Sequence, residues 1–202
     1  RGPMHINVPH REPLAGLAPI TPLNIDRPQQ DIKQKSVSEE QQQELITKLS
    51  QYKKVMLLAS FAEPDAELDK SLSQLVKLPQ VVLLTETISN INVEGVITTI
   101  DRTLTQLTNE NRADAAPELL ITFGGSLVSK MVKTFIRTYK PKEHIHISEC
   151  EWKIDTFSAL TWQINLTATN LFSLIADKVI SANSNYNQMW HKLAQSAAEK
   201  KS

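Results

Sequence analysis

Two hydrophobic patterns alternate along this chain: short uninterrupted apolar runs, and longer stretches with an apolar residue at every third or fourth position. A continuous apolar run predicts a strand that is buried on both faces of a parallel sheet. The three-to-four spacing predicts an amphipathic helix. We assign to strands residues 54–60, 81–85, 119–123, 143–148 and 161–166. We assign to helices residues 38–52, 63–78, 97–107, 127–139, 168–179 and 188–200.

The order of these segments predicts the class of fold. Strands that alternate with helices form an α/β fold, in which a doubly wound parallel sheet is covered by helices on both faces. We expect a Rossmann-like sheet of five to six strands. One assignment has an alternative, because residues 96–100 could also form a strand.

The chain divides into four segments of different character. We expect residues 1–9, whose apolar residues alternate between prolines, to be the last strand of a truncated domain. Residues 10–37 contain four prolines and little periodicity, which predicts an extended linker. Residues 38–180 hold the α/β domain. Residues 181–202 combine a polar turn with a terminal helix, which we expect to lead into a further domain.

Charge and cysteine content narrow the classes of function. The chain has 22 basic and 22 acidic residues, so its formal net charge is zero, and it has no basic stripe to bind nucleic acid. The single cysteine excludes an intrachain disulfide and suits the reducing cytoplasm. No apolar run approaches the length of a membrane span. These features favour a cytoplasmic protein that neither binds nucleic acid nor spans a membrane.

A glycine turn, residues 124–126, separates the strand at residues 119–123 from the following helix. Open α/β sheets bind their ligands at the carboxyl ends of such strands. The turn matches no complete glycine motif: Val128 replaces the third glycine of a dinucleotide fingerprint, and Ser129 replaces the glycine before the lysine of a phosphate-binding loop. The Gly-x-Ser-x-Gly pattern of a serine nucleophile is also incomplete. Two interpretations stay open, a tight turn and an anion contact.

Lys130 is the candidate binding residue near this turn. It is predicted to lie about one turn inside the helix, roughly 6–8 Å from the helix start. An anion bound at that end would interact with both the free N–H groups and the ammonium. In that case Gly124, Gly125 and Ser126 would form the turn beside the anion. The alternative is that Lys130 points into solvent.

Other polar residues give no catalytic or metal site. His144 and His146 lie on one face of a predicted strand, but no third or fourth ligand follows at a recognisable spacing, so we expect structural histidines. Asp155 lacks an acid–base partner in the sequence and is expected to form a cap or a turn. We therefore assign no catalytic, cofactor-binding or metal-binding residue.

Two segments resemble those of a known enzyme family. Residues 2–14, Gly-Pro-Met-His-Ile-Asn-Val-Pro-His-Arg-Glu-Pro-Leu, resemble the segment that ends the pyrimidine-binding domain of thiamine-diphosphate enzymes. Residues 123–130, Phe-Gly-Gly-Ser-Leu-Val-Ser-Lys, are similar to the Gly-x-x-Leu-x-x-Lys turn of one group of these enzymes. This group is the 2-succinyl-5-enolpyruvyl-6-hydroxy-3-cyclohexene-1-carboxylate synthases of menaquinone biosynthesis. The resemblance covers essentially the whole chain.

The resemblance implies a place for each segment. Residues 1–9 would end a pyrimidine-binding domain, residues 38–180 would be the complete middle domain, and residues 181–202 would lead into a pyrophosphate-binding domain. The whole enzyme would be a homo-oligomeric transferase that uses thiamine diphosphate and Mg²⁺. It would decarboxylate 2-oxoglutarate and add the succinyl unit to isochorismate. Lys130 would contact a carboxylate substrate, and the fragment alone would be inactive.

The same fold allows a second function. Middle domains related by the resemblance bind nucleotide or flavin cofactors, so the chain could be a regulatory module that binds a nucleotide or metabolite above the glycine turn. The incomplete glycine fingerprint argues against a dinucleotide.

Overall fold

The computed structural model describes residues 36–150 and 152–200, and the chain separates into two units, residues 1–34 and 35–202. The strand predicted at residues 1–9 lies outside the described residues. So does the linker predicted at residues 10–37, apart from its last two residues.

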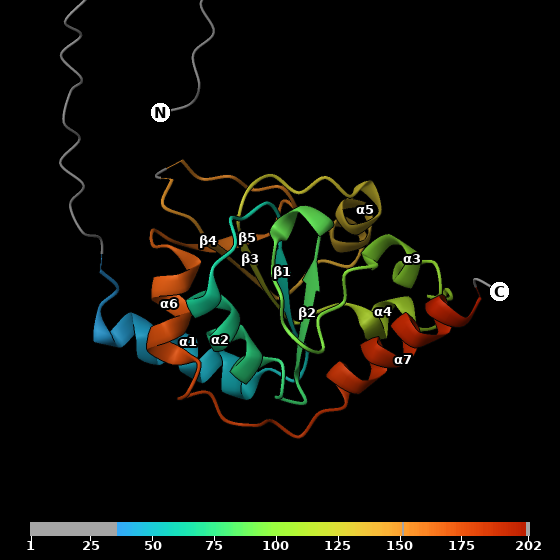
Figure 1. Cartoon of the computed structure of the whole chain (residues 1–202), viewed down its shortest axis with the longest axis horizontal. Helices are drawn as coiled ribbons and strands as arrows, with labels where there is room; N and C mark the ends of the chain where they lie inside the picture. The colour runs from blue at the N-terminus through green and yellow to red at the C-terminus, as the bar shows by residue number, and fades with distance from the viewer. Residues whose placement is uncertain (1–35, 151, 201–202) are drawn as a thin grey trace, which may run out of the picture. The chain divides into compact units, whose positions relative to one another are not determined.

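The second unit is built on one sheet of five parallel strands, in the order β2-β1-β3-β4-β5 (Figure 1). The strands are β1 Val55–Ala59, β2 Val81–Thr85, β3 Leu119–Phe123, β4 Glu143–Ile147 and β5 Leu160–Ile164. The strand β1 is in register with both of its neighbours, so that Val55 pairs with Val81 of β2 and with Leu119 of β3. The strands therefore end together, at what we call the carboxyl edge of the sheet. The predicted doubly wound α/β fold is confirmed, with five strands.

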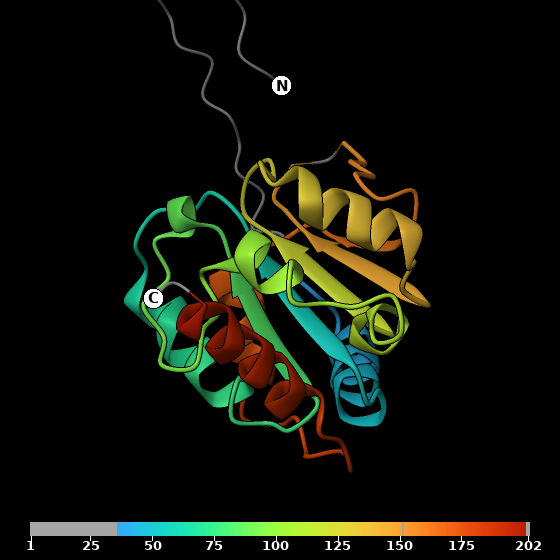
Figure 2. The same ribbon diagram turned by 90° about the vertical axis from the view of Figure 1, so that its right-hand side faces the viewer.

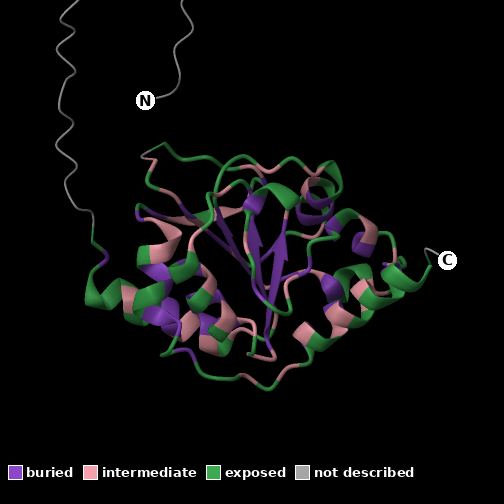
Figure 3. Cartoon of the chain, viewed as in Figure 1, coloured by how far each residue is buried: buried purple, intermediate pink, exposed green. Residues whose placement is uncertain are grey.

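Helices cover both faces of this sheet, as Figure 2 shows. One layer holds α1 Glu39–Gln51, α2 Ala66–Leu75 and α6 Ala168–Ile175. The other holds α3 Ile100–Leu104, α4 Arg112–Ala115, α5 Lys130–Thr138 and α7 Tyr186–Glu199. Alternate strand residues pack on opposite layers, so Leu57 faces α1, α2 and α6 whereas Met56 and Leu58 face the others. The strands β1, β2 and β3 are buried throughout (Figure 3), as their continuous apolar runs predicted.

The helix starts follow capping chemistry. Ser38 caps α1 with a capping box that it forms with Gln41. The helix predicted to start at residue 63 starts later, at Ala66, because the Asp65 carboxylate accepts hydrogen bonds from the N–H groups of Glu67 and Leu68. The early start predicted for this helix was wrong.

The segment at residues 96–107, for which the sequence allowed a helix or a strand, contains a β-bridge followed by a short helix. Ile97 forms an isolated parallel bridge with Leu84, and the helix α3 begins only at Ile100. The prediction of one helix over residues 97–107 was wrong because the backbone of Ile97 bonds to the edge strand β2. Between β2 and this bridge lies a short 3₁₀-helix, η1 Thr87–Ser89.

The helix after the glycine turn is shorter than predicted. It begins at Lys130, because the Ser129 hydroxyl accepts a hydrogen bond from the Val132 N–H and caps it. Val128 therefore lies in the preceding loop and is 67% exposed, and Met131 is 40% exposed. The prediction that both belong to the buried stripe was wrong, since only the later apolar residues of α5 face the sheet.

The terminal helix α7 is not isolated. Tyr186 and Trp190 on it are fully buried, and the Tyr186 hydroxyl donates a hydrogen bond to the Ala115 carbonyl at 2.8 Å. The Asn187 side chain donates hydrogen bonds to the carbonyls of Val76 and Val81, which joins α7 to the end of α2 and to the first residue of β2. The helix that we expected to lead out of the domain thus belongs to one of the two helical layers that cover its sheet. A further domain beyond it stays a prediction.

Candidate functional site

The loops at the carboxyl edge diverge between β1 and β3, the two strands where the sheet order changes direction. Doubly wound sheets form their ligand crevice at such a point. Here it holds two cavities. One, of about 510 Å³, opens between α2 and α6 and is lined by Phe61, Asp65 and Thr169 among others. The second, of about 360 Å³, opens between α5 and the loop after β4.

The glycine turn is set by a close approach of two loops. Gly124 has a positive φ of 85°, and a Cβ atom there would lie 2.7 Å from the Phe61 carbonyl oxygen. The Gly125 N–H donates a hydrogen bond to the same carbonyl at 2.7 Å. Gly124 is therefore required both by its backbone conformation and by the neighbouring loop. This supports the interpretation as a tight turn.

The anion that contacts this turn is a side chain of the protein itself. Glu86, the residue after β2, accepts hydrogen bonds from the N–H groups of Val128 at 2.8 Å and Ser129 at 2.7 Å. Its other carboxylate oxygen accepts one from the Ser60 hydroxyl at 2.5 Å. The sequence analysis missed Glu86, because its partners are distant in sequence and no local motif marks them.

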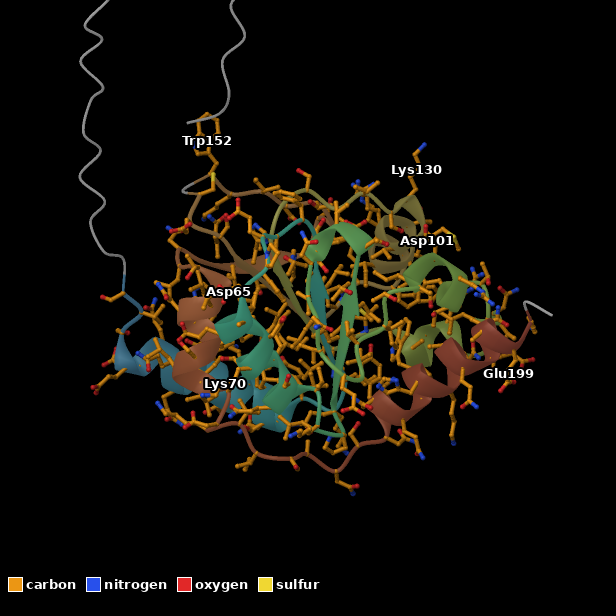
Figure 4. All side chains as sticks on the ribbon, in the orientation of Figure 1. Asp65, Lys70, Asp101, Lys130, Trp152 and Glu199 are labelled. Carbon is orange, nitrogen blue, oxygen red and sulfur yellow. The ribbon has the colours of Figure 1, made fainter. Side chains whose placement is uncertain are left out.

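Lys130 lies away from the glycine turn. It is the first residue of α5, not one turn inside it, and its side chain is exposed and projects away from the ribbon in Figure 4. It lines a third hollow of about 290 Å³ with Arg112, Leu104 and Leu107, whereas neither large cavity includes it. Within the described part of the chain its ammonium has no hydrogen-bond or ion-pair partner. Lys130 therefore lines a different hollow from Gly124, Gly125 and Ser126.

A different lysine lies beside the turn. Lys133, one helical turn after Lys130, is half-buried and lines the 360 Å³ cavity together with Gly124, Gly125 and Ser126. The sequence analysis passed over it, although its spacing from Lys130 was a usable signal. Residues three apart on a helix are neighbours on its surface, so Lys133 lies next to Lys130 along α5.

The two histidines of β4 form the floor of this cavity. The Thr122 hydroxyl on β3 is 2.8 Å from His144 Nε2 and 2.8 Å from His146 Nδ1. His144 is 1% exposed, and its Nδ1 is buried without a hydrogen-bond partner among the described residues. We call this space the histidine cavity; Thr122, Lys133, His144 and His146 define it. The expected single-face placement of the histidines is confirmed.

Burial controls the charge of both histidines. Burial, with a smaller contribution from the neighbouring His146, lowers the pKa of His144 to about 4, and Asp155 opposes this shift. Burial likewise lowers the pKa of His146, against an opposing hydrogen bond from Thr122. Both imidazoles are therefore neutral at pH 7.

Asp155 has the structural role that its sequence position indicated. Its carboxylate accepts hydrogen bonds from the N–H groups of Phe157, Ala159 and Leu160, and so shapes the turn before β5. Among residues 36–150 and 152–200, no group of three or more His, Cys, Asp or Glu side chains could hold a metal ion. In the same ranges, no helix is long and apolar enough to cross a membrane.

Comparison with known proteins gives consistent matches. A sequence profile described as "Middle domain of thiamine pyrophosphate" matches residues 24–200. A protein of Flavobacterium psychrophilum is 33% identical over 92% of this chain and 33% of its own length. One of Porphyromonas gingivalis is 36% identical over 89% of this chain and 31% of its own length. One of Christiangramia forsetii is 37% identical over 73% of this chain and 26% of its own length.

All three relatives are named 2-succinyl-5-enolpyruvyl-6-hydroxy-3-cyclohexene-1-carboxylate synthase. The chain spans about a third of the length of the first of these relatives. The five-stranded parallel sheet agrees with the profile, which covers every helix and strand described above. The chain therefore belongs to the family of middle domains of thiamine pyrophosphate enzymes, as its sequence resemblance had predicted.

Proposed function

We propose that this chain is the middle domain of a synthase that decarboxylates 2-oxoglutarate and adds the succinyl unit to isochorismate in menaquinone biosynthesis. The observation that carries the proposal is the similarity to relatives that all bear the name of that synthase, at 33% to 37% identity. In this proposal the whole enzyme is a cytoplasmic homo-oligomer, and the domain bounded by α1 and α7 is not catalytic by itself.

The proposal assigns thiamine diphosphate and Mg²⁺ to other domains of the enzyme. The sequence contains no Gly-Asp-Gly motif, and the described residues offer no cluster of metal ligands. The side chains of this domain would therefore bind and orient a substrate and hold neither group. A domain that precedes this one would end near residue 9, and one that follows would begin after α7.

Lys130 is the residue that we propose to contact a carboxylate substrate. Its ammonium has no partner in the described part of the chain, and its side chain projects away from the ribbon in Figure 4. Val128 and Met131, which lie close to it in sequence, are also exposed. Contact with a neighbouring domain would cover these apolar side chains and remove water from the ammonium. A charge-assisted hydrogen bond to a carboxylate would then hold the substrate in position.

Steady-state kinetics of the full-length enzyme that carries this sequence tests the proposal. Lys130→Ala should raise KM for 2-oxoglutarate or isochorismate about tenfold or more, because a charged hydrogen bond contributes about 1.5–3 kcal/mol. Lys192→Ala, which removes an exposed lysine on α7, is the matched control and should leave both KM values unchanged. Unchanged KM values in Lys130→Ala would remove this residue from the site. Absence of product from the two substrates would overturn the function itself.

A further inference from the structure

The histidine cavity contains polar groups that the fold does not use. Lys133 Nζ makes no hydrogen bond or ion pair within the described ranges. His146 bonds to Thr122 through Nδ1, and its Nε2 has no hydrogen-bond partner among the described residues. His144 Nδ1 is buried and unpartnered among the described residues. Buried polar groups are normally satisfied, so these groups indicate a space for a bound molecule or water.

Thr122 fixes what the histidines can offer to such a molecule. Its hydroxyl has one proton, so it donates to one imidazole and accepts from the other. When it donates to His144 Nε2, it accepts from the Nδ1–H of His146. His146 Nε2 then faces a ligand as an acceptor when the ring is neutral and as a donor when it is protonated.

The charge of the lining favours an anion. Of the described residues that line the cavity, Lys133 is the one with a permanent charge, and none of them is Asp or Glu. The remaining polar groups are hydroxyls and imidazoles, including Ser126, Ser148 and Thr156. An ammonium without a counter-ion attracts a carboxylate more strongly in a partly enclosed site than in water.

The turn beside the cavity argues against phosphate. Phosphate sites usually depend on several free backbone N–H groups. Here the N–H groups of Val128 and Ser129 bond to Glu86, and that of Gly125 bonds to the Phe61 carbonyl. A single carboxylate requires fewer donors, and Lys133 with His146 could provide them.

The remaining walls are apolar. Leu127, Ile154 and Phe157 line the cavity, whose volume of about 360 Å³ lies in the range of small-molecule sites. We propose that the histidine cavity binds a small organic carboxylate with an apolar body, held by the Lys133 ammonium and by His146 Nε2. This site is distinct from the one proposed at Lys130, and it does not depend on the synthase activity.

Binding in this arrangement is coupled to a proton. Lys133 from α5 lines the cavity together with His146, His144 lies on the same strand as His146, and Asp155 of the following loop acts on His144. Because burial keeps His146 neutral, a carboxylate beside Nε2 would raise the pKa of the ring and favour protonation. The affinity for a carboxylate should therefore increase as the pH falls from 8 to 6.

Isothermal titration calorimetry of this 202-residue chain with benzoate tests the proposal. Benzamide has nearly the same shape without the charge, and it should bind at least about tenfold more weakly because it lacks the charge-assisted hydrogen bond. Inorganic phosphate serves as the third ligand and should bind more weakly than benzoate. Absence of benzoate binding, equal binding of benzamide, or preferred binding of phosphate would each overturn the proposal.

Two variants locate the binding. Lys133→Met keeps the aliphatic stem and should weaken benzoate about tenfold, whereas Lys192→Met on α7 should leave the affinity unchanged. His146→Asn keeps a group that can bond to Thr122 but removes Nε2, so it should abolish the increase in affinity at low pH. Circular dichroism confirms that each variant is folded. Wild-type affinity and pH dependence in both Lys133→Met and His146→Asn would contradict the assignment of the site.

Discussion

The two ends of the strands differ in whether the charged side chains near them have partners. At the amino edge, where the strands begin, the ionised groups are paired: Glu143 accepts hydrogen bonds from Lys48 at 2.7 and 2.9 Å and from Tyr52 at 2.8 Å. Glu118 pairs there with Lys142 at 2.7 Å. At the carboxyl edge, Lys130 and Lys133 have no such partner within the described residues, and two neutral histidines are buried.

Exposed apolar side chains are likewise concentrated at the carboxyl edge. Eight large apolar side chains are exposed among the described residues, and six of them belong to loops or a helix start that follow strands at the carboxyl edge. These six are Phe61, Ile88, Val128, Met131, Trp152 and Ile154. The amino edge is thus built for stability, whereas the carboxyl edge carries groups that would be satisfied only by a ligand or another domain.

The largest expected effect tests what holds the carboxyl edge together. Gly124→Ala should lower the free energy of unfolding by about 4 kcal/mol, because a Cβ at positive φ is strained and would also lie 2.7 Å from the Phe61 carbonyl oxygen. Gly95→Ala is the matched control, since Gly95 has a φ of 83° but its Cβ would meet only His191 at 3.9 Å. It should cost about 1 kcal/mol. Urea denaturation measures both, and equal losses would show that the loop contact at Gly124 is unimportant.

A smaller effect concerns the buried histidine. The folded-state pKa of His144, about 4, lies below its ordinary value of 6.5, so the unfolded chain binds a proton that the folded chain does not. The stability present above pH 6.5 should therefore fall as the pH falls toward 4, by about 3 kcal/mol in total.

The His144→Gln variant isolates this contribution. Glutamine keeps an amide group that can bond to Thr122 but does not titrate in this range. Its stability should change less than that of the wild type between pH 6.5 and 4, as measured by denaturation at each pH. Parallel pH profiles for the two proteins would exclude His144 as the cause.

The smallest predicted effect tests the amino edge. Glu143→Gln should reduce stability by about 1–2 kcal/mol at pH 7, because it removes a partly buried charge that bonds to Lys48 and Tyr52. Burial raises the pKa of Glu143, but these two partners outweigh burial and lower it. Its contribution is thus present above the ordinary pKa of glutamate and is lost as the pH falls through the lowered value.

An exposed ion pair of the same edge provides the comparison for Glu143. Asp114→Asn removes the partner of Lys54, which lies 3.5 Å away on a carboxylate that is 79% exposed. This change should stay within about 0.5 kcal/mol. Thermal unfolding at two salt concentrations would compare the pairs, and an equal loss in both variants would contradict the greater importance that we assign to Glu143.

The sequence predicted best those elements whose signal is local. The strands β1 and β3 are continuous apolar runs, and the helix predicted from residue 38 begins at Glu39 with Ser38 as its cap, so both elements were identified. Errors occurred where distant residues decide the outcome. Ile97 bonds to β2 and does not belong to a helix, and Trp190 packs into the core although its helix was expected to lead into a further domain.

The sequence by itself determined the fold class, the family and the position of the glycine turn at the carboxyl edge, because each depends on local periodicity or on a contiguous motif. Only the tertiary structure decided which groups meet there. Glu86 reaches the turn from β2, Lys133 takes the place beside it that Lys130 was expected to hold, and Thr122 joins two histidines from the next strand. These contacts connect separate strands and loops, and their geometry depends on sheet order and on close packing, which no single segment encodes.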